Sequence, residues 1–222
     1  MTLPKPYYQD SAVTLYHGDC RQIVPLLGRF DLLLTDPPYG MRLDTDYSKT
    51  ATAGKLPGTK WDRVVGDDKD FDPAFLLTLS IPSVIWGANH FASRLKDRGS
   101  WLVWNKRGDG EPSGMHFGDC EMAWTNLSFS GARIFSQMWH GAPRWRKEPC
   151  VHPTQKSVDL MVWCLGFAPD AQTVLDPFAG SGTTGRACKD LGRKCVMIER
   201  EEKYCEIAAR RMGQEVLPLD AA

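Results

Sequence analysis

The sequence has few of the features that mark membrane, secreted and metal-binding proteins. No apolar run approaches the ~18 residues of a membrane-spanning helix, and the opening residues, Met1 to Pro6, do not form a signal peptide. Seven cysteines are scattered without a Cys-x-x-Cys pair, a pattern that argues against a disulfide framework and a zinc site. We therefore expect a cytoplasmic protein with no membrane contact and no bound metal.

An excess of one charge sign is also missing, because Lys+Arg and Asp+Glu both number 27. Nucleic-acid-binding proteins are often basic overall, so a nucleic-acid partner would have to be held by a local basic patch. The best candidate is Arg144-Trp145-Arg146-Lys147, since it mixes basic and aromatic residues. A solvated loop with one tryptophan in the core explains the same segment equally well.

Strand-like and helix-like segments alternate along the 222 residues, which is typical of a single α/β domain over 1–222. Apolar runs predict strands at 12–17, 31–35, 83–87, 100–104, 173–175 and 194–198, with an antiparallel strand at 121–127. Helical patterns and caps predict helices at 20–27, 71–79, 89–96, 154–165, 185–191 and 201–212. The segment 41–70 is polar and irregular, as functional or disordered loops are.

The tetrapeptide Asp36-Pro37-Pro38-Tyr39 follows one of these buried strands. It would lie at the carboxyl end of the strand, where open α/β sheets keep their active sites. The two prolines hold the backbone rigid and extended. This arrangement fixes a carboxylate, a carbonyl and an aromatic face in one small volume. It suits a planar nitrogen heterocycle that is gripped by its amino group and stacked on its face.

A second motif, Asp176-Pro177-Phe178-Ala179-Gly180-Ser181-Gly182-Thr183-Thr184, joins a predicted strand to a predicted helix. Glycines in such a turn let the backbone approach a ligand, and amides at the helix N-terminus favour an anionic group. Glu199 ends the next strand and could accept hydrogen bonds from both ribose hydroxyls. The pattern fits a nucleoside-containing cofactor. The Gly-x-Gly-x-x-Gly spacing also leaves a nicotinamide-dependent oxidoreductase open.

Together the two motifs resemble those of S-adenosylmethionine-dependent DNA amino-methyltransferases, the N6-adenine/N4-cytosine family. Asp36-Pro37-Pro38-Tyr39 resembles the catalytic motif, and Asp176 to Gly182 resembles the cofactor motif. His152-Pro153-Thr154-Gln155-Lys156 resembles the lead-in helix of the cofactor motif, and Gly18-Asp19 a further cofactor segment. The catalytic motif comes first, an order that resembles the permuted, beta-type group.

The resemblance implies a mostly parallel seven-stranded sheet with helices on both faces and one antiparallel strand, a permuted Rossmann-like methyltransferase fold. In that fold the segment from Thr154 onward lies beside the N-terminal strands. The resemblance also implies a bacterial or phage-like protein of the restriction-modification type, with DNA as partner and a homodimer as a candidate assembly. Because no separate recognition domain is evident, DNA would be read by loops 41–70, 106–120 and 137–151.

The resemblance also assigns roles to residues. Asp36 and the carbonyl of Pro37 would accept the amino hydrogens of a flipped base, with Pro38 in the same motif and Tyr39 stacked on the base. S-adenosylmethionine would be bound by Asp19, Cys20, Lys156, Asp176, Pro177, Phe178, Gly180, Ser181, Gly182, Thr183, Thr184 and Glu199. DNA phosphates would be contacted by Arg144, Arg146 and Lys147.

Two of these assignments have open alternatives. Asp36 favours adenine as the target, because N4-cytosine enzymes of this family usually carry serine at that place, but N4-cytosine stays an alternative. Lys156 would help to hold the cofactor carboxylate, and an exposed lysine in the first turn of a helix explains it equally well. An inactive DNA-binding relative is a further alternative, against which the intact motifs argue.

Overall fold

The computed structural model describes residues 2–46, 60–107, 118–138, 151 and 154–214, which form a nine-stranded mixed sheet covered by helices. The strands are β1 (Tyr8–Gln9), β2 (Val13–His17), β3 (Leu32–Thr35), β4 (Ser83–Trp86), β5 (Trp101–Asn105), β6 (Cys120–Thr125), β7 (Ala132–Ser136), β8 (Thr173–Asp176) and β9 (Lys194–Glu199). They lie in the order β1-β2-β9-β8-β3-β4-β6-β5-β7.

The expectation of seven strands, one of them antiparallel, is wrong, because the sheet has nine strands and both β1 and β6 run against their neighbours. The two additional strands are β1, which is only two residues long, and β7, which pairs in parallel with β5 at the sheet edge. In β7 four of the five residues are exposed, so no apolar alternation marks it in the sequence.

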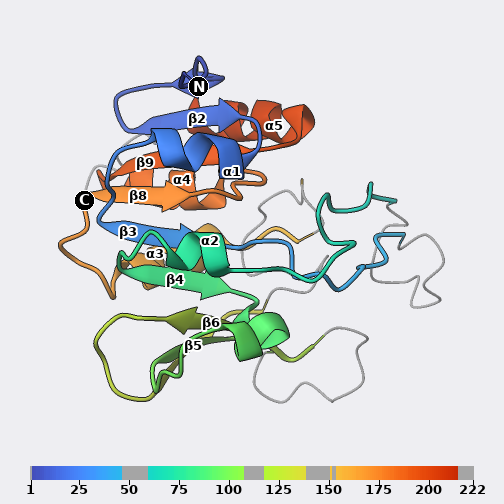
Figure 1. Ribbon diagram of the computed structural model, residues 1–222, viewed down its shortest axis with the longest axis vertical. Helices are drawn as coiled ribbons and strands as arrows, with labels where there is room; N and C mark the ends of the chain where they lie inside the picture. Colours follow the sequence, from blue (N-terminus) through green and yellow to red (C-terminus); the bar gives the residue numbers. More distant parts are fainter. Residues whose placement is uncertain (1, 47–59, 108–117, 139–150, 152–153, 215–222) are drawn as a thin grey trace, which may run out of the picture.

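The centre of the sheet combines distant parts of the chain (Figure 1). Strand β8 pairs in parallel with β3, and β9 pairs in parallel with β2, so both late strands lie between two early ones. This placement agrees with the expectation that the segment from Thr154 onward lies beside the N-terminal strands. It brings the carboxyl ends of β2, β9, β8, β3 and β4 to one edge.

Helices cover both faces of the sheet, as the alternation of buried strand residues requires. Leu32 and Leu34 belong to the core on one face and Leu33 to the core on the other. The first face carries α3 (Val158–Leu165), α4 (Thr183–Asp190) and α5 (Glu202–Met212). The second carries α1 (Cys20–Ile23), α2 (Ala74–Leu77) and the 3-10 segments η1 (Val24–Leu26) and η3 (Ala88–Arg94).

Several helices differ from their predicted bounds. The predicted helix 154–165 begins only at Val158, because the Ser157 hydroxyl accepts the Leu160 amide and caps the helix there. The predicted helix 20–27 tightens into η1 at Pro25, and the predicted helix 89–96 is the 3-10 segment η3. The predicted helix 71–79 is helical only over α2, and α4 begins two residues before the predicted start at Gly185.

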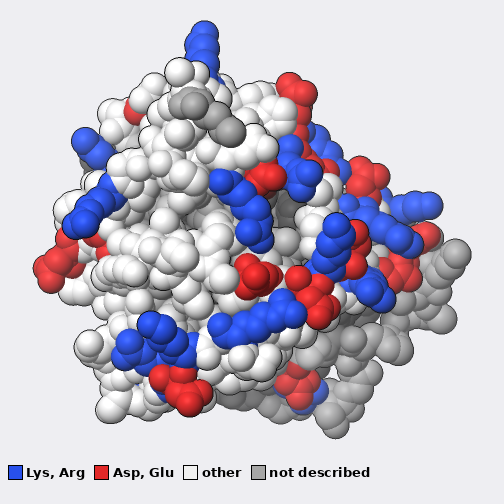
Figure 2. Space-filling model, in the orientation of Figure 1, with Lys and Arg blue, Asp and Glu red and all other residues white. Residues whose placement is uncertain are grey.

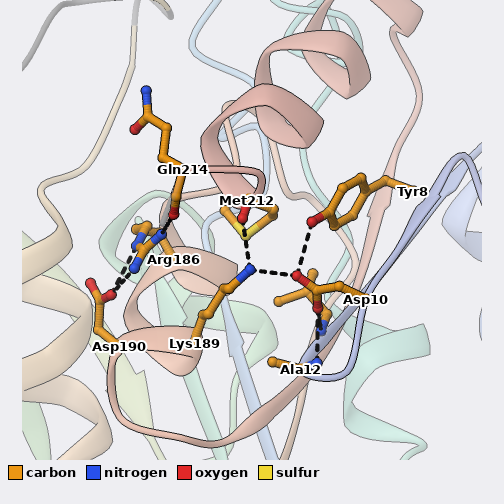
Figure 3. Close-up of polar contacts among 9 residues, drawn as sticks. Tyr8, Asp10, Ala12, Arg186, Lys189, Asp190, Met212 and Gln214 are labelled. Atoms are coloured by element: carbon orange, nitrogen blue, oxygen red, sulfur yellow. Dashed lines mark hydrogen bonds and ion pairs between the residues drawn. The ribbon is translucent and has the colours of Figure 1, made fainter. Parts of the chain in front are cut away.

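Charged side chains of α4 tie it to both ends of the described chain (Figure 3). Lys189 Nζ lies 2.5 Å from Asp10 Oδ2 and donates to the Met212 carbonyl at 2.7 Å. Arg186 donates to the Gln214 carbonyl at 2.8 Å and pairs with Asp190. These contacts satisfy carbonyls at the end of α5, which have no partner within the helix, and they fix the turn before β2 against α4.

Candidate functional site

Three predicted acidic residues reach the same edge of the sheet. Asp36 follows the last residue of β3, whereas Asp176 and Glu199 end β8 and β9. These strands are parallel members of one sheet, so their carboxyl ends open on the same side. Figure 1 shows the described loop segments after β3 and before α2 extending beyond this edge. The candidate site is therefore at the place where open α/β sheets bind ligands.

Asp36 is held by a partly buried cluster of charged and hydroxyl groups. Tyr39 donates its hydroxyl proton to Asp36 Oδ1 at 2.5 Å, and Lys156 Nζ lies 2.6 Å from Asp36 Oδ2. Lys156 Nζ also lies 2.9 Å from Glu121 Oε2 and 3.0 Å from the Tyr39 hydroxyl. Burial raises the pKa of Asp36, and the Lys156 ammonium acts in the opposite direction.

The position of Lys156 corrects one reading of the sequence. Its side chain is only 4% exposed, so it is not a surface lysine of a helical first turn. The ammonium is directed to Asp36, and only the Lys156 carbonyl reaches the glycine-rich turn, where the Thr183 hydroxyl donates to it at 3.3 Å. Burial alone lowers the pKa of Lys156, but the neighbouring carboxylates of Asp36 and Glu121 outweigh it and raise that pKa.

Glu121 and Lys106 belong to this cluster but were not predicted from the sequence. Strand β6 runs antiparallel to β4, so its beginning, with Glu121, lies at the site edge. Lys106 follows β5, the other neighbour of β6, and its ammonium pairs with Glu121 Oε1. Burial raises the pKa of Glu121, but Lys156 and Lys106 overcome it and lower that pKa to about 2. A single glutamate at a strand start gives no sequence signal for this role.

The ring of Tyr39 is positioned by the segment after β4. It stacks on His90, with centroids 5.1 Å apart and planes 13° apart. Gly87, which has φ +71°, lies against the same ring: a Cβ there would be 1.8, 2.2 and 2.4 Å from three adjacent ring carbons. Such distances describe an atom over the ring face. No side chain larger than that of glycine fits at this position.

The glycine-rich turn between β8 and α4 has the predicted form. Gly182 has φ +80° and caps α4, and a Cβ there would lie 2.9 Å from the Ala208 Cβ of α5. Ser181, Thr183 and Thr184 are buried. Phe178 packs edge-on against Phe71 and Phe75. Glycine at position 182 is therefore required by the left-handed backbone and by the close packing of the turn against α5.

Asp176 links the two motifs. Its Oδ1 accepts the Thr35 hydroxyl at 2.7 Å and the Phe178 amide at 3.1 Å, and Thr184 also donates to it. Thr35 is the residue before Asp36, so this bond links the start of the Asp36 segment to the start of the glycine-rich segment. Burial, which disfavours the charged form, raises the pKa of Asp176 to about 6.

Asp176→Asn is expected to stabilise the protein more at neutral pH than in mild acid. An acid with a raised folded-state pKa favours folding while protonated, so the wild-type protein loses this contribution as pH rises from 3.8 to about 6. Asparagine does not titrate. The stability of the variant relative to the wild type should therefore increase by up to about 3 kcal/mol over this range. Urea denaturation at about pH 4 and about pH 7.5 measures it; a pH-independent difference would contradict the raised pKa.

The predicted cofactor residues Glu199 and Asp19 lie in neighbouring segments. Glu199 Oε2 accepts the Gly180 amide at 2.8 Å, and the Gly18 amide donates to the Glu199 carbonyl at 2.8 Å. Asp19 caps α1 by accepting the Arg21 amide at 2.9 Å. Burial raises the pKa of Cys20 to about 12, which makes it a neutral thiol. Burial also raises the pKa of Glu199.

The segment after Tyr39 is organised by a carboxylate that the sequence did not reveal. Asp67 is buried, and it accepts the amides of Gly40 at 2.9 Å, Met41 at 3.0 Å and Leu43 at 2.7 Å. These bonds join two parts of the predicted loop 41–70. Asp67 therefore fixes the path of the chain as it leaves the catalytic motif.

The predicted DNA-contact residues Arg144, Arg146 and Lys147 lie outside the described residues, as do 47–59, 108–117 and 139–150 of the three predicted loops. Figure 2 shows basic and acidic side chains intermingled on the described surface in that view. Among the described residues no helix is long and apolar enough to cross a membrane. The same residues contain no group of three or more His, Cys, Asp or Glu that could hold a metal ion.

Comparison with known proteins identifies the family of this chain. The model of the N6_N4_Mtase family, described as DNA methylase, matches residues 81–210, more than half of the chain. The chain belongs to this DNA methylase family. The match covers the cofactor motif, Lys156 and Glu121 of the methylase, and the Asp36 motif lies before it.

Individual relatives agree over nearly the whole length of the methylase. The type II methyltransferase M.ScaI of Streptomyces caespitosus is 28% identical, over 98% of this chain and 86% of that protein. The solved structure of an M1.HpyAVI–SAM complex has 25% identity and a TM-score of 0.53, covering 90% of this chain and 99% of that one. The cytosine-N4-specific PvuII DNA methyltransferase has a TM-score of 0.62, covering 96% and 90%. At 14% identity, this likeness shows the fold alone.

Proposed function

We propose that this DNA methylase transfers a methyl group from S-adenosylmethionine to the N6 amino group of adenine in DNA. The observation that carries the proposal is the 2.7 Å hydrogen bond from Thr35 to Asp176. It sets Asp36, an acceptor suited to an amino group, beside a turn suited to a nucleoside cofactor. Methyl transfer needs this juxtaposition of acceptor and donor, and it is accelerated mainly by positioning.

The chemistry follows from the groups at Asp36. The lone pair of an adenine amino group is delocalised into the ring, so the nitrogen is a poor nucleophile. Asp36 and the Pro37 carbonyl would each accept one amino hydrogen and favour a pyramidal nitrogen. Its lone pair would then displace the sulfur from the sulfonium methyl group in line: the carbon–sulfur bond would break as the nitrogen–carbon bond forms, neutral S-adenosylhomocysteine would leave, and one amino proton would pass to Asp36. Inside a duplex the amino group is inaccessible, so the base is flipped out and stacked on Tyr39.

The cofactor residues fit S-adenosylmethionine. A carboxylate has about four acceptor positions. The Glu199 carboxylate accepts the amides of Gly180 and Glu201 and also interacts with the Arg200 amide, which leaves capacity for a ribose hydroxyl. Asp19 follows Gly18, whose amide donates to the Glu199 carbonyl at 2.8 Å, so both carboxylates belong to the same part of the site. The M1.HpyAVI structure was solved as a SAM complex, which supports the same cofactor here. When bound, this cofactor supplies the activated methyl group.

The choice of adenine rests on Asp36, because N4-cytosine enzymes of this type usually carry serine there. N4-cytosine is the second candidate, because the family to which the chain belongs includes both N6 and N4 enzymes. We further propose that the methylase is a single domain with the beta-type order of motifs. Arg144, Arg146 and Lys147 would contact DNA phosphates.

Nucleoside mass spectrometry tests this function. The purified chain is incubated with unmethylated DNA and isotopically labelled S-adenosylmethionine, and the DNA is digested to nucleosides. Labelled N6-methyladenine is expected, and its absence with N4-methylcytosine present would assign cytosine instead. Calorimetry with S-adenosylmethionine and NAD is the control for the cofactor, since tight binding of NAD alone would overturn the proposal.

A further inference from the structure

The Asp36 carboxylate has protein partners on both of its oxygens. The Tyr39 hydroxyl lies on Oδ1 at 2.5 Å and the Lys156 ammonium on Oδ2 at 2.6 Å. A carboxylate has about four acceptor positions, so an amino group can still bind Asp36, but it then lies close to the Lys156 ammonium. The ammonium is unfavourable beside the reaction, because the attacking nitrogen gains positive charge as it takes the methyl group. Lys156 therefore has to move away from Asp36 for the transfer to proceed well.

Glu121 is close enough to accept the Lys156 ammonium when it leaves Asp36. A single oxygen, Glu121 Oε2, lies 2.9 Å from Lys156 Nζ and 3.3 Å from the Tyr39 hydroxyl. Both groups that occupy Asp36 thus have a second acceptor within reach. A small shift of either one toward Glu121 frees an oxygen of Asp36. Neither group is then left buried without a partner, which would be costly.

Glu121 is itself held in place by other contacts. Its second oxygen pairs with Lys106, whose ammonium also lies 5.1 Å from the centre of the Trp104 ring. The cluster of Asp36, Glu121, Lys106 and Lys156 has two carboxylates and two ammonium groups, so its formal charge is balanced. Moving Lys156 from one carboxylate toward the other changes no net charge within this buried volume.

We propose that Glu121 is a positioning residue that accepts Lys156 and Tyr39 when the target base takes their place on Asp36. This inference rests on the proposed methyl transfer and adds a residue to that site. In the base-free protein, Lys156 bridges Asp36 and Glu121. In the base-bound protein, Asp36 accepts the amino hydrogen, and Lys156 stays on Glu121 alone. Glu121 touches neither base nor cofactor and acts through Lys156 and Tyr39.

A double-mutant cycle tests this role. Glu121→Gln is expected to lower kcat at least about tenfold while the KM for S-adenosylmethionine changes less than about twofold, since only the exchange at Asp36 is impaired. In a Lys156→Met background the same substitution should not lower kcat, because no ammonium has to be drawn away and the glutamine carbonyl still accepts the Tyr39 hydroxyl. Equal fold losses in the two backgrounds, or an undiminished kcat in Glu121→Gln, would overturn the proposal.

Controls separate this role from simple structural support. Glu206→Gln removes an exposed carboxylate that pairs with Arg210 on α5, and it should leave kcat unchanged. Glu121→Asp keeps the charge and should restore part of the activity; it also replaces Glu121→Gln in the cycle if that variant does not fold. Absence of methyl transfer by the wild-type protein would instead contradict the proposed function.

If Lys156→Met has no measurable turnover, a crystal structure of the base-bound complex tests the role of Glu121 instead. The protein is crystallised with S-adenosylhomocysteine and a DNA duplex that it methylates. Lys156 Nζ should then lie beyond hydrogen-bond distance of Asp36 and within it of Glu121. A retained bond between Lys156 and Asp36 in the base-bound complex would show that Glu121 is no alternative acceptor.

Discussion

Asp36→Ala is expected to abolish methyl transfer, with a loss of at least about a thousandfold, while leaving the Kd for S-adenosylmethionine within about threefold. The substitution removes the acceptor that orients the amino nitrogen. The other carboxylate of the cluster, Glu121, lies on β6 and not after β3, so it does not replace Asp36. The fold should persist, because Lys156 keeps Glu121 Oε2 at 2.9 Å as its partner. Filter binding of labelled DNA measures transfer, and calorimetry measures cofactor affinity.

The matched control is Asp97→Ala, which removes an exposed carboxylate away from the site and should leave both quantities unchanged. A large loss of cofactor affinity in Asp36→Ala would show that the catalytic and cofactor motifs have been assigned to the wrong ligands. Near-normal transfer would show that the amino group is oriented by other groups.

Gly87→Ala is expected to reduce methyl transfer at least about a hundredfold and to destabilise the protein by about 1–3 kcal/mol. The methyl group would lie 1.8 Å from a ring carbon of Tyr39 at a residue with φ +71°. Either the ring or the backbone after β4 has to move. Because Tyr39 donates to Asp36, a displaced ring disturbs the acceptor as well as the stacking surface. Urea denaturation and the transfer assay measure the two effects.

Gly99→Ala is the matched control, since a Cβ at Gly99 would meet no atom within 4 Å. It should leave activity and stability nearly unchanged. If Gly87→Ala were as active as Gly99→Ala, the position of the Tyr39 ring would not matter for transfer.

Local sequence signals identified the two motifs and predicted the strands that precede them. Asp36 follows a strand built on three consecutive leucines, Leu32 to Leu34, and Asp176 and Glu199 each end a strand. Their position at a common edge therefore follows from the geometry of parallel sheets. The sequence also indicated correctly that the late strands β8 and β9 lie beside early ones. These inferences need only residues that are adjacent in the chain together with a recognised order of motifs.

The features that the sequence did not predict depend on contacts between residues that are far apart in the chain. Glu121 at the start of a strand looks like a solvent-facing residue, and only the folded sheet places it beside Lys156. Gly87 was predicted only as the last residue of a strand, and its contact with Tyr39 is visible only in three dimensions. The predicted helix start at Thr154 was wrong. The Ser157 side chain caps the helix further along the chain, and the Lys156 side chain binds Asp36 instead of lying on a helical first turn.

The arrangement of the central strands also determines the order in which the molecule can assemble. In the finished sheet Leu32 pairs with Val174, and Val13 pairs with Cys195. During synthesis, β2 and β3 leave the ribosome with open edges long before β8 and β9 exist to fill the space between them. Such distant pairings make folding slow and expose the nascent chain to aggregation. A chain interrupted before β9 would therefore lack the middle of its sheet instead of one edge.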